Sequence, residues 1–156
     1  MKALIVYYSR TGTTKKVAEE LADRLKADKE EIIDKKNRKG PIGYMIAGKD
    51  AMRKKLTKIN ELKKNPENYD LLVIGTPIWA FTMVPAIRTF LMKIKYYNKK
   101  IALFYTAGSS GMEKTLTHMN ELLPGSKLTA TLSLTTSEVV NKRYDKKLDI
   151  FIKNLK

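Results

Sequence analysis

The chain has 156 residues, of which 43% are hydrophobic, and it carries 31 Lys and Arg against 16 Asp and Glu, a net charge of +15. This length predicts one globular domain over residues 1–156. The absence of cysteine excludes disulfides and thiolate metal sites. The first apolar run lasts six residues without a cleavage pattern, and no later run approaches the length of a membrane span, so we expect a soluble cytoplasmic protein.

The positive charge is concentrated in residues 35–64, which hold eleven Lys or Arg and two acidic residues, a local charge of +9. Such a segment attracts acidic proteins, nucleic acid or anionic membranes. A lysine-rich composition is also common in heat-adapted proteins, where it says little about partners.

The first 25 residues form the most informative stretch. Residues 3–8 are a continuous β-favouring apolar run, as expected of a strand buried on both faces of a parallel sheet. Residues 9–14 form a short hydroxyl-rich loop, and the apolar residues that follow recur at helical spacing, which predicts a helix over about 14–27. A strand that leads into a helix in this way directs backbone N–H groups toward one point, where a phosphate can bind.

The composition of this loop favours a terminal monophosphate. It lacks the sequence patterns of triphosphate and dinucleotide loops. Its hydroxyls and its glycine could surround an oxyanion with neutral donors, and these residues are Ser9, Arg10, Thr11, Gly12, Thr13 and Thr14. The alternative is an ordinary turn with Thr13 or Thr14 as the helix N-cap.

The rest of the chain alternates strands and helices. The expected strands cover residues 30–34, 71–74, 101–105 and 128–134, and the expected helices run from Met45 to Leu62, Pro85 to Ile94, Met112 to Leu123 and onward from about Ser137. Five strands interleaved with helices predict an α/β fold, a doubly wound parallel sheet covered by helices on both faces. Ligands of such sheets bind outside the carboxyl ends of the strands, here at the loops 9–14, 76–82 and 106–111.

The second of these loops contains Trp79, the only tryptophan in the chain. An indole near the protein surface is expected to cover an apolar partner, and a flat aromatic ligand would suit it. Thr76 could add a hydrogen bond to the edge of such a ring. The alternative is that Trp79 packs against its own helix or at a subunit contact.

Two of these segments resemble the flavodoxin family. YYSRTGTT at residues 7–14 resembles its phosphate loop, and GTPIW at residues 75–79 resembles the loop beside its flavin ring. The resemblance implies a flavodoxin-like five-stranded sheet of order 2-1-3-4-5 and non-covalently bound FMN. It also implies ring contacts from Thr76, Pro77, Ile78, Trp79 and Ala80, with further contacts from Thr106, Ala107, Gly108, Ser109 and Gly111.

The chain departs from the electron carriers of that family at two places. The loop 106–111 lacks the aromatic residue that covers the second face of the flavin in those carriers. Ala80 replaces a glycine whose peptide reorients on reduction, and alanine resists the positive φ that this requires. These departures add weight to a second function class.

Three function classes follow. The first is an FMN-binding electron-transfer protein, and the second is an FMN-dependent NAD(P)H oxidoreductase that acts on a quinone or another small acceptor. A basic nucleic-acid-binding module is disfavoured, because aromatic residues are not interleaved with the basic segment. We expect no catalytic residue outside the cofactor site. His118, the only histidine, is expected to be solvated.

The basic segment also suggests a partner. Lys35, Lys36, Arg38 and Lys39 follow the second strand at the edge expected to hold the cofactor. They would form a positive rim that attracts an acidic redox protein or an anionic small substrate. We expect no membrane insertion, and either a monomer or a homodimer.

Overall fold

The computed structural model describes residues 1–96 and 98–155. Its elements in chain order are β1 (Ala3–Tyr7), α1 (Thr13–Leu25), β2 (Asp28–Glu31), α2 (Gly40–Met52), a 3₁₀ turn η1 (Pro66–Asn68), β3 (Leu71–Trp79), β4 (Thr82–Met83), α3 (Pro85–Lys93), β5 (Lys100–Ala107), α4 (Met112–Glu121), β6 (Lys127–Thr135), α5 (Thr136–Val140) and α6 (Asp145–Leu155).

The sheet has the order that the sequence predicts. Five parallel strands follow the path β2-β1-β3-β5-β6, which is 2-1-3-4-5 when only the parallel strands are numbered. The short β4 pairs antiparallel with the end of β3. The predicted flavodoxin-like doubly wound fold is therefore confirmed.

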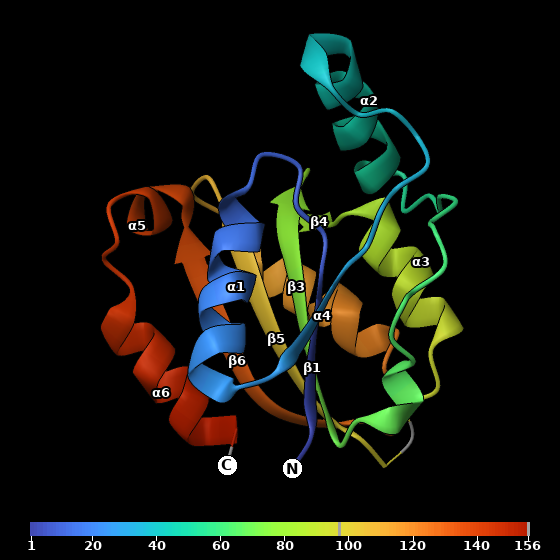
Figure 1. The fold of residues 1–156 in the computed structure, drawn as a ribbon. Coiled ribbons are helices and arrows are strands. Elements are labelled where there is room, and N and C mark those ends of the chain that lie inside the picture. Colours follow the sequence, from blue (N-terminus) through green and yellow to red (C-terminus); the bar gives the residue numbers. More distant parts are fainter. Residues whose placement is uncertain (97, 156) are drawn as a thin grey trace.

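Helices cover both faces of this sheet (Figure 1). Alternate residues of β1 point to opposite faces, so Leu4 and Val6 join one apolar core while Ile5 and Tyr7 join the other. The first core is completed by α3 and α4, and the second by α1, α5 and α6. Burial on both faces explains why the three central strands, β1, β3 and β5, are predominantly apolar.

β3 continues past Gly75, where the sequence predicted its end. Gly75 serves as a point of close approach, because a Cβ atom there would lie 2.0 Å from Cζ of the fully buried Phe104 on β5. The strand runs on to Trp79 and turns back through Ala80 and Phe81 into β4. The expected loop 76–82 is thus a β-hairpin.

The predicted strand at residues 30–34 and helix from Met45 to Leu62 are wrong in their bounds. β2 begins at Asp28, directly after Lys26 ends α1 in the left-handed conformation. α2 begins earlier, with Pro41 in its first turn, and ends at Met52. Figure 1 shows α2 beyond the end of the sheet to which β3 points.

Residues 54–64 form no helix, because distant parts of the chain bind their backbone. The amide of Asn60 donates to the carbonyl of Ile33, and Lys58 accepts from the amide of Lys35. Thr57 exchanges two hydrogen bonds of 3.0 Å with the hydroxyl of Thr89 on α3. These bonds satisfy backbone groups that a helix would otherwise pair internally.

The last predicted helix consists of two helices. α5 is closed by a capping box between Thr135 and Glu138, and it ends at Val140. Lys142 has a positive φ of 51° in the connection that leads to α6.

His118 is buried, so the expectation that it is solvated is wrong. Only 9% of the residue is exposed, and its Nδ1 lies 2.8 Å from the hydroxyl oxygen of Thr82. The side of α4 that carries His118 faces β4.

No helix in the described part of the chain has both the length and the apolar character needed to cross a bilayer.

The close contact at Gly75 generates a prediction. Gly75→Ala places a methyl group against the Phe104 ring in a fully packed core, so we expect the free energy of unfolding to fall by about 1–3 kcal/mol. Urea denaturation followed by circular dichroism measures the change. Gly48→Ala in α2 is the control, since its Cβ meets nothing within 4 Å and alanine favours a helix. Equal stability of the two variants would contradict this packing argument.

Candidate functional site

Three loops meet at the carboxyl ends of β1, β3 and β5, as the sequence predicts. Parallel pairing aligns these ends, and Pro77 on β3 lies opposite Thr106 on β5. The pocket between them is lined by Arg10, Thr11, Thr13, Thr14, Tyr44, Pro77, Ile78, Trp79, Thr106, Ala107, Gly108 and Thr136. Ten of these twelve residues are among those predicted from the sequence.

The loop 9–14 presents the N-terminus of α1 to this pocket. Gly12 is the N-cap, with φ of 94°, a conformation that glycine adopts without strain. No side chain caps the helix, so the first amides of α1 donate no hydrogen bond to a capping side chain. The pocket therefore combines a positive helix end with backbone donors, which is the chemistry that holds a phosphate.

The hydroxyls of this loop have different roles. Thr14 is buried, and its hydroxyl lies 2.8 Å from that of Thr106, which ties the loop to β5. Ser9 accepts a 3.1 Å hydrogen bond from the amide of Gly12 and so holds the turn. Thr11 and Thr13 are more accessible, and their hydroxyl oxygens are 3.4 Å apart. These two hydroxyls are the ones available to a ligand.

Arg10 joins the loop to the start of α2. Its Nε donates to the carbonyl of Arg38 at 3.0 Å, and its guanidinium lies 5.2 Å from the ring centre of Tyr44. Tyr44 thereby becomes a pocket residue. Tyr44 was not predicted as a site residue, because the helix was expected to begin at Met45, after Tyr44.

Trp79 is half-buried at the end of β3 and lines the pocket. Its ring packs edge-to-face against Tyr8, with centroids 5.5 Å apart at an angle of 88°. The guanidinium of Arg38 lies 6.0 Å from the Trp79 ring centre. These contacts hold the indole in position before any ligand binds.

The hairpin turn beyond Trp79 is strained. Ala80 and Phe81 have φ of 47° and 63°, so both central residues of a two-residue turn are left-handed. This conformation costs about 1–2 kcal/mol for each residue that is not glycine. Ala80 thus has a positive φ, the conformation that alanine resists.

Several predicted residues lie outside the pocket lining. Thr76 is fully buried, and its hydroxyl donates to the Pro77 carbonyl at 2.7 Å and accepts from the Val84 amide at 3.3 Å. Gly111 is the N-cap of α4, where a Cβ atom would lie 2.9 Å from Cα of Phe81. The others that do not line it are Ser9, Gly12, Ala80 and Ser109.

Thr136 was missed for a different reason. It is the first residue of α5, directly after β6, and its hydroxyl donates to the carbonyl of Ala107 at 3.2 Å. The predicted site comprised only the loops 9–14, 76–82 and 106–111. It did not include the segment after β6, the fifth parallel strand. The alignment of parallel strands would have pointed to it.

The predicted basic rim is only partly present. Arg38 is buried and forms ion pairs with Asp34 at 2.7 Å and with Asp50 at 3.0 Å, so its assignment to an exposed rim is wrong. Burial opposes its charge, but the bonds to these two carboxylates outweigh burial and raise the pKa of Arg38. Lys36 also pairs with Asp50 at 2.7 Å. Lys35 and Lys39 remain exposed.

The pKa of Asp50, a buried acid of this cluster, shifts downward, whereas that of Arg38 shifts upward. Burial alone would raise the pKa of Asp50, yet its bonds to Lys36 and Arg38 lower that pKa. The Arg38–Asp50 pair therefore stays ionised at neutral pH and connects the segment before α2 to the last turn of that helix.

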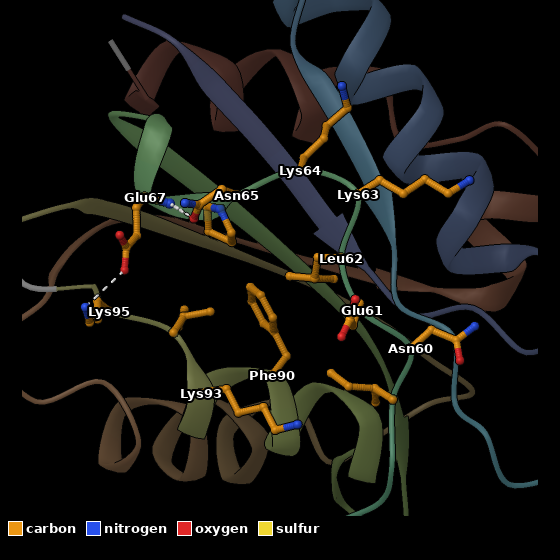
Figure 2. Close-up of a pocket in the computed structure, with 13 residues that line it drawn as sticks. Asn60, Glu61, Leu62, Lys63, Lys64, Asn65, Glu67, Phe90, Lys93 and Lys95 are labelled. Atoms are coloured by element: carbon orange, nitrogen blue, oxygen red, sulfur yellow. Dashed lines mark hydrogen bonds and ion pairs between the residues drawn. The ribbon is translucent and has the colours of Figure 1, made fainter.

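A second pocket, of about 470 Å³, lies between residues 59–67 and the end of α3 (Figure 2). Leu62 and Phe90 point toward each other in it, and Lys95 pairs with Glu67 at 3.6 Å at its edge. It contains none of the predicted site residues and, among the described residues, no N-terminus of an α-helix. The pocket at the carboxyl edge is therefore the candidate functional site.

Solved structures with this fold include flavoproteins. A flavoprotein from Lactobacillus acidophilus NCFM, determined in complex with FMN, is 28% identical over 90% of this chain and 97% of its own, with a TM-score of 0.69. Flavodoxin 2 from Bacillus cereus, in its oxidised form, is 18% identical over 99% of this chain and 98% of its own, with a TM-score of 0.67. A flavodoxin from Streptococcus pneumoniae TIGR4 is 14% identical over 99% and 97% of the two chains, with a TM-score of 0.62.

No curated protein sequence matches the chain. The family described as Flavodoxin, in contrast, matches residues 2–147, which include all three loops of the pocket. The chain belongs to the flavodoxin family.

Proposed function

We propose that this protein binds FMN in the pocket at the carboxyl edge of the sheet and transfers electrons between redox enzymes. One observation carries the proposal: a single pocket joins the uncapped N-terminus of α1 to the side chain of Trp79. The first feature suits a phosphate and the second suits an aromatic ring. The bound flavin supplies the redox chemistry, while the protein positions it and shields it from water.

The phosphate of FMN would be held by the loop 9–14. The amides at the start of α1 and the hydroxyls of Thr11 and Thr13 are its donors. Arg10 adds a positive charge at the mouth of the pocket. Ser9, Gly12 and Thr14 support this loop from within, through the contacts described above.

The ring system would be held by the other two loops. Pro77, Ile78 and Trp79 supply apolar surface on one side. Thr106, Ala107 and Gly108 line the pocket beside them, and Gly108, which follows the end of β5, could offer backbone hydrogen bonds to polar ring atoms. Tyr44 is a second aromatic residue at this pocket, although the loop 106–111 has none. The FMN complex of the similar Lactobacillus flavoprotein supports this assignment.

The proposed partner is an acidic redox protein or an anionic small substrate. Lys35 and Lys39 are exposed between β2 and α2, at the edge that holds the pocket. Their charges and the net charge of +15 would accelerate encounter with a negatively charged partner. Arg38 has no part in this steering because it is buried and paired.

The phosphate assignment is tested by Thr11→Ala combined with Thr13→Ala. Loss of two donors to a charged phosphate should weaken FMN binding by about 1–3 kcal/mol for each donor. Titration of cofactor-free protein with FMN, followed by quenching of flavin fluorescence, gives the dissociation constant. Thr117→Ala is the matched control, since Thr117 is exposed on α4 and binds the carbonyl of Glu113. If the double variant binds FMN as tightly as Thr117→Ala does, these two hydroxyls do not hold the phosphate.

The steering role is tested with two small oxidants of opposite charge, ferricyanide and hexaamminecobalt(III). We expect ferricyanide to oxidise the reduced FMN protein up to about tenfold more slowly at high than at low ionic strength, because salt screens the attraction. The cationic oxidant should show the reverse trend. Stopped-flow absorbance of the flavin measures both rates.

Two pairs of charge-reversal substitutions distinguish the contribution of the rim lysines to the oxidation rate from that of the net charge. Lys35→Glu with Lys39→Glu should reduce the ferricyanide rate at low salt. Lys146→Glu with Lys153→Glu changes the net charge equally on α6, where both lysines are exposed. Equal effects of the two pairs would show that net charge, and not the rim, controls the encounter.

A further inference from the structure

Three buried polar side chains form a cluster behind the Trp79 hairpin, and none of them lines the pocket. Thr82 of β4, Arg88 of α3 and His118 of α4 are 3%, 6% and 9% exposed. The Thr82 hydroxyl oxygen lies 2.8 Å from Nδ1 of His118 and 3.3 Å from Nη2 of Arg88. One hydroxyl thus links three separate elements.

The direction of one of these hydrogen bonds is fixed, and that of the other depends on the protonation of His118. A guanidinium only donates, so Arg88 donates to the Thr82 oxygen. In the neutral tautomer that carries its hydrogen on Nε2, Nδ1 of His118 accepts the hydroxyl hydrogen of Thr82, so that both groups of the pair are satisfied. Protonation of His118 places a hydrogen on Nδ1, so that two positively charged donors, Nδ1 of His118 and Nη2 of Arg88, face the same Thr82 oxygen while the Thr82 hydroxyl hydrogen loses its acceptor.

The surrounding charges also oppose protonation of His118. Arg88 forms no ion pair with a carboxylate among the described residues, and its Nε lacks a hydrogen-bond partner there. Burial, and then the nearby cations Lys54, Arg88 and Lys114, lower the pKa of His118, while Glu121 acts in the opposite direction. The neutral imidazole is therefore the form that this structure accommodates.

The hairpin depends on support from outside itself. Thr82 pairs with Trp79 across the turn, and Met83 pairs with Ile78. The turn between them contains the strained Ala80 and Phe81. Trp79 and Ile78 line the pocket, so a change at Thr82 reaches the pocket through two residues of the same hairpin.

We propose that His118 is a positioning residue: its neutral imidazole anchors Thr82 and holds the Trp79 hairpin in its pocket-lining position, and protonation of His118 releases that hairpin. The effect on FMN affinity rests on the function proposed above, whereas the effect on the hairpin does not.

The direction of the pH dependence follows from linkage. Since the pKa of His118 in the folded protein is lowered from 6.5, the support it gives to the hairpin is fully present above pH 6.5. That support decreases as the pH falls below 6.5 toward the lower pKa of the folded state. Acid therefore loosens the hairpin.

The cofactor-free protein provides a direct test, because Trp79 is the only tryptophan and His118 the only histidine. Between about pH 8 and about pH 5 we expect the Trp79 emission to change in a single-proton transition with its midpoint below 6.5. NMR titration of the His118 ring should give the same midpoint. Far-UV circular dichroism over the same range separates this local change from acid unfolding.

His118→Asn is the decisive variant. The Oδ1 atom of asparagine can take the place of Nδ1 as an acceptor for Thr82, but it does not titrate. We expect its Trp79 emission to match that of the native protein at pH 8 and to stay constant toward pH 5. A native protein without the transition, or an Asn variant that keeps it, would overturn the proposal.

FMN binding gives the second measurement. The dissociation constant of the native protein should rise roughly three- to tenfold between about pH 7.5 and about pH 5.5, and that of His118→Asn should rise less. Equal rises in the two proteins would overturn the link to the pocket. A protein that binds no FMN at any pH contradicts the proposed function alone, since the fluorescence test still decides whether His118 holds the hairpin.

Discussion

The close approach between Gly75 and Phe104 determines how β3 fits between its neighbours. A side chain at Gly75 would occupy the same space as the Phe104 ring, so the two strands adopt their register without displacing that ring only with glycine at this position. The register in turn places Pro77 beside Thr106. The relative position of two pocket loops is therefore set by packing in the core, two residues before the pocket along each strand. The third loop follows because β1 pairs with the other edge of β3.

The features predicted correctly from the sequence are those that depend on neighbouring residues or on the alignment of parallel strands. The apolar run 3–8, the loop with Gly12 and the amphipathic helix could be recognised from neighbouring residues alone. Residues 54–64 could not, because their conformation depends on bonds to Ile33, Lys35 and Thr89, far away in the sequence. Tyr44 was missed for a related reason. Its place in the pocket depends on where α2 begins, and Arg10 holds that start through hydrogen bonds to the carbonyls of Arg38 and Gly40.

Charge counting was informative about the whole chain and misleading for single residues. Arg38 belongs by sequence to a run of cations, but it is buried between Asp34 and Asp50. Taking a guanidinium out of water is tolerable when carboxylates replace the lost hydration. Arg88 is buried without such partners among the described residues, and burial lowers its pKa. Its uncompensated charge therefore acts on neighbouring groups, whereas the charge of Arg38 is neutralised where it lies.

The hairpin at Ala80 and Phe81 combines strain with a dependence on neighbours. A two-residue turn of this kind favours Asn-Gly, and this chain has two residues that resist positive φ. Such a turn persists only when surrounding contacts support it. The N-terminus of α4 supplies one contact, since Gly111 packs against Phe81 so closely that a Cβ atom would lie 2.9 Å from its Cα. His118, one to two turns further along the same helix, supplies another through Thr82. Because both supports come from α4, a small displacement of that helix would alter the position of Trp79 more than it would alter the loop 9–14.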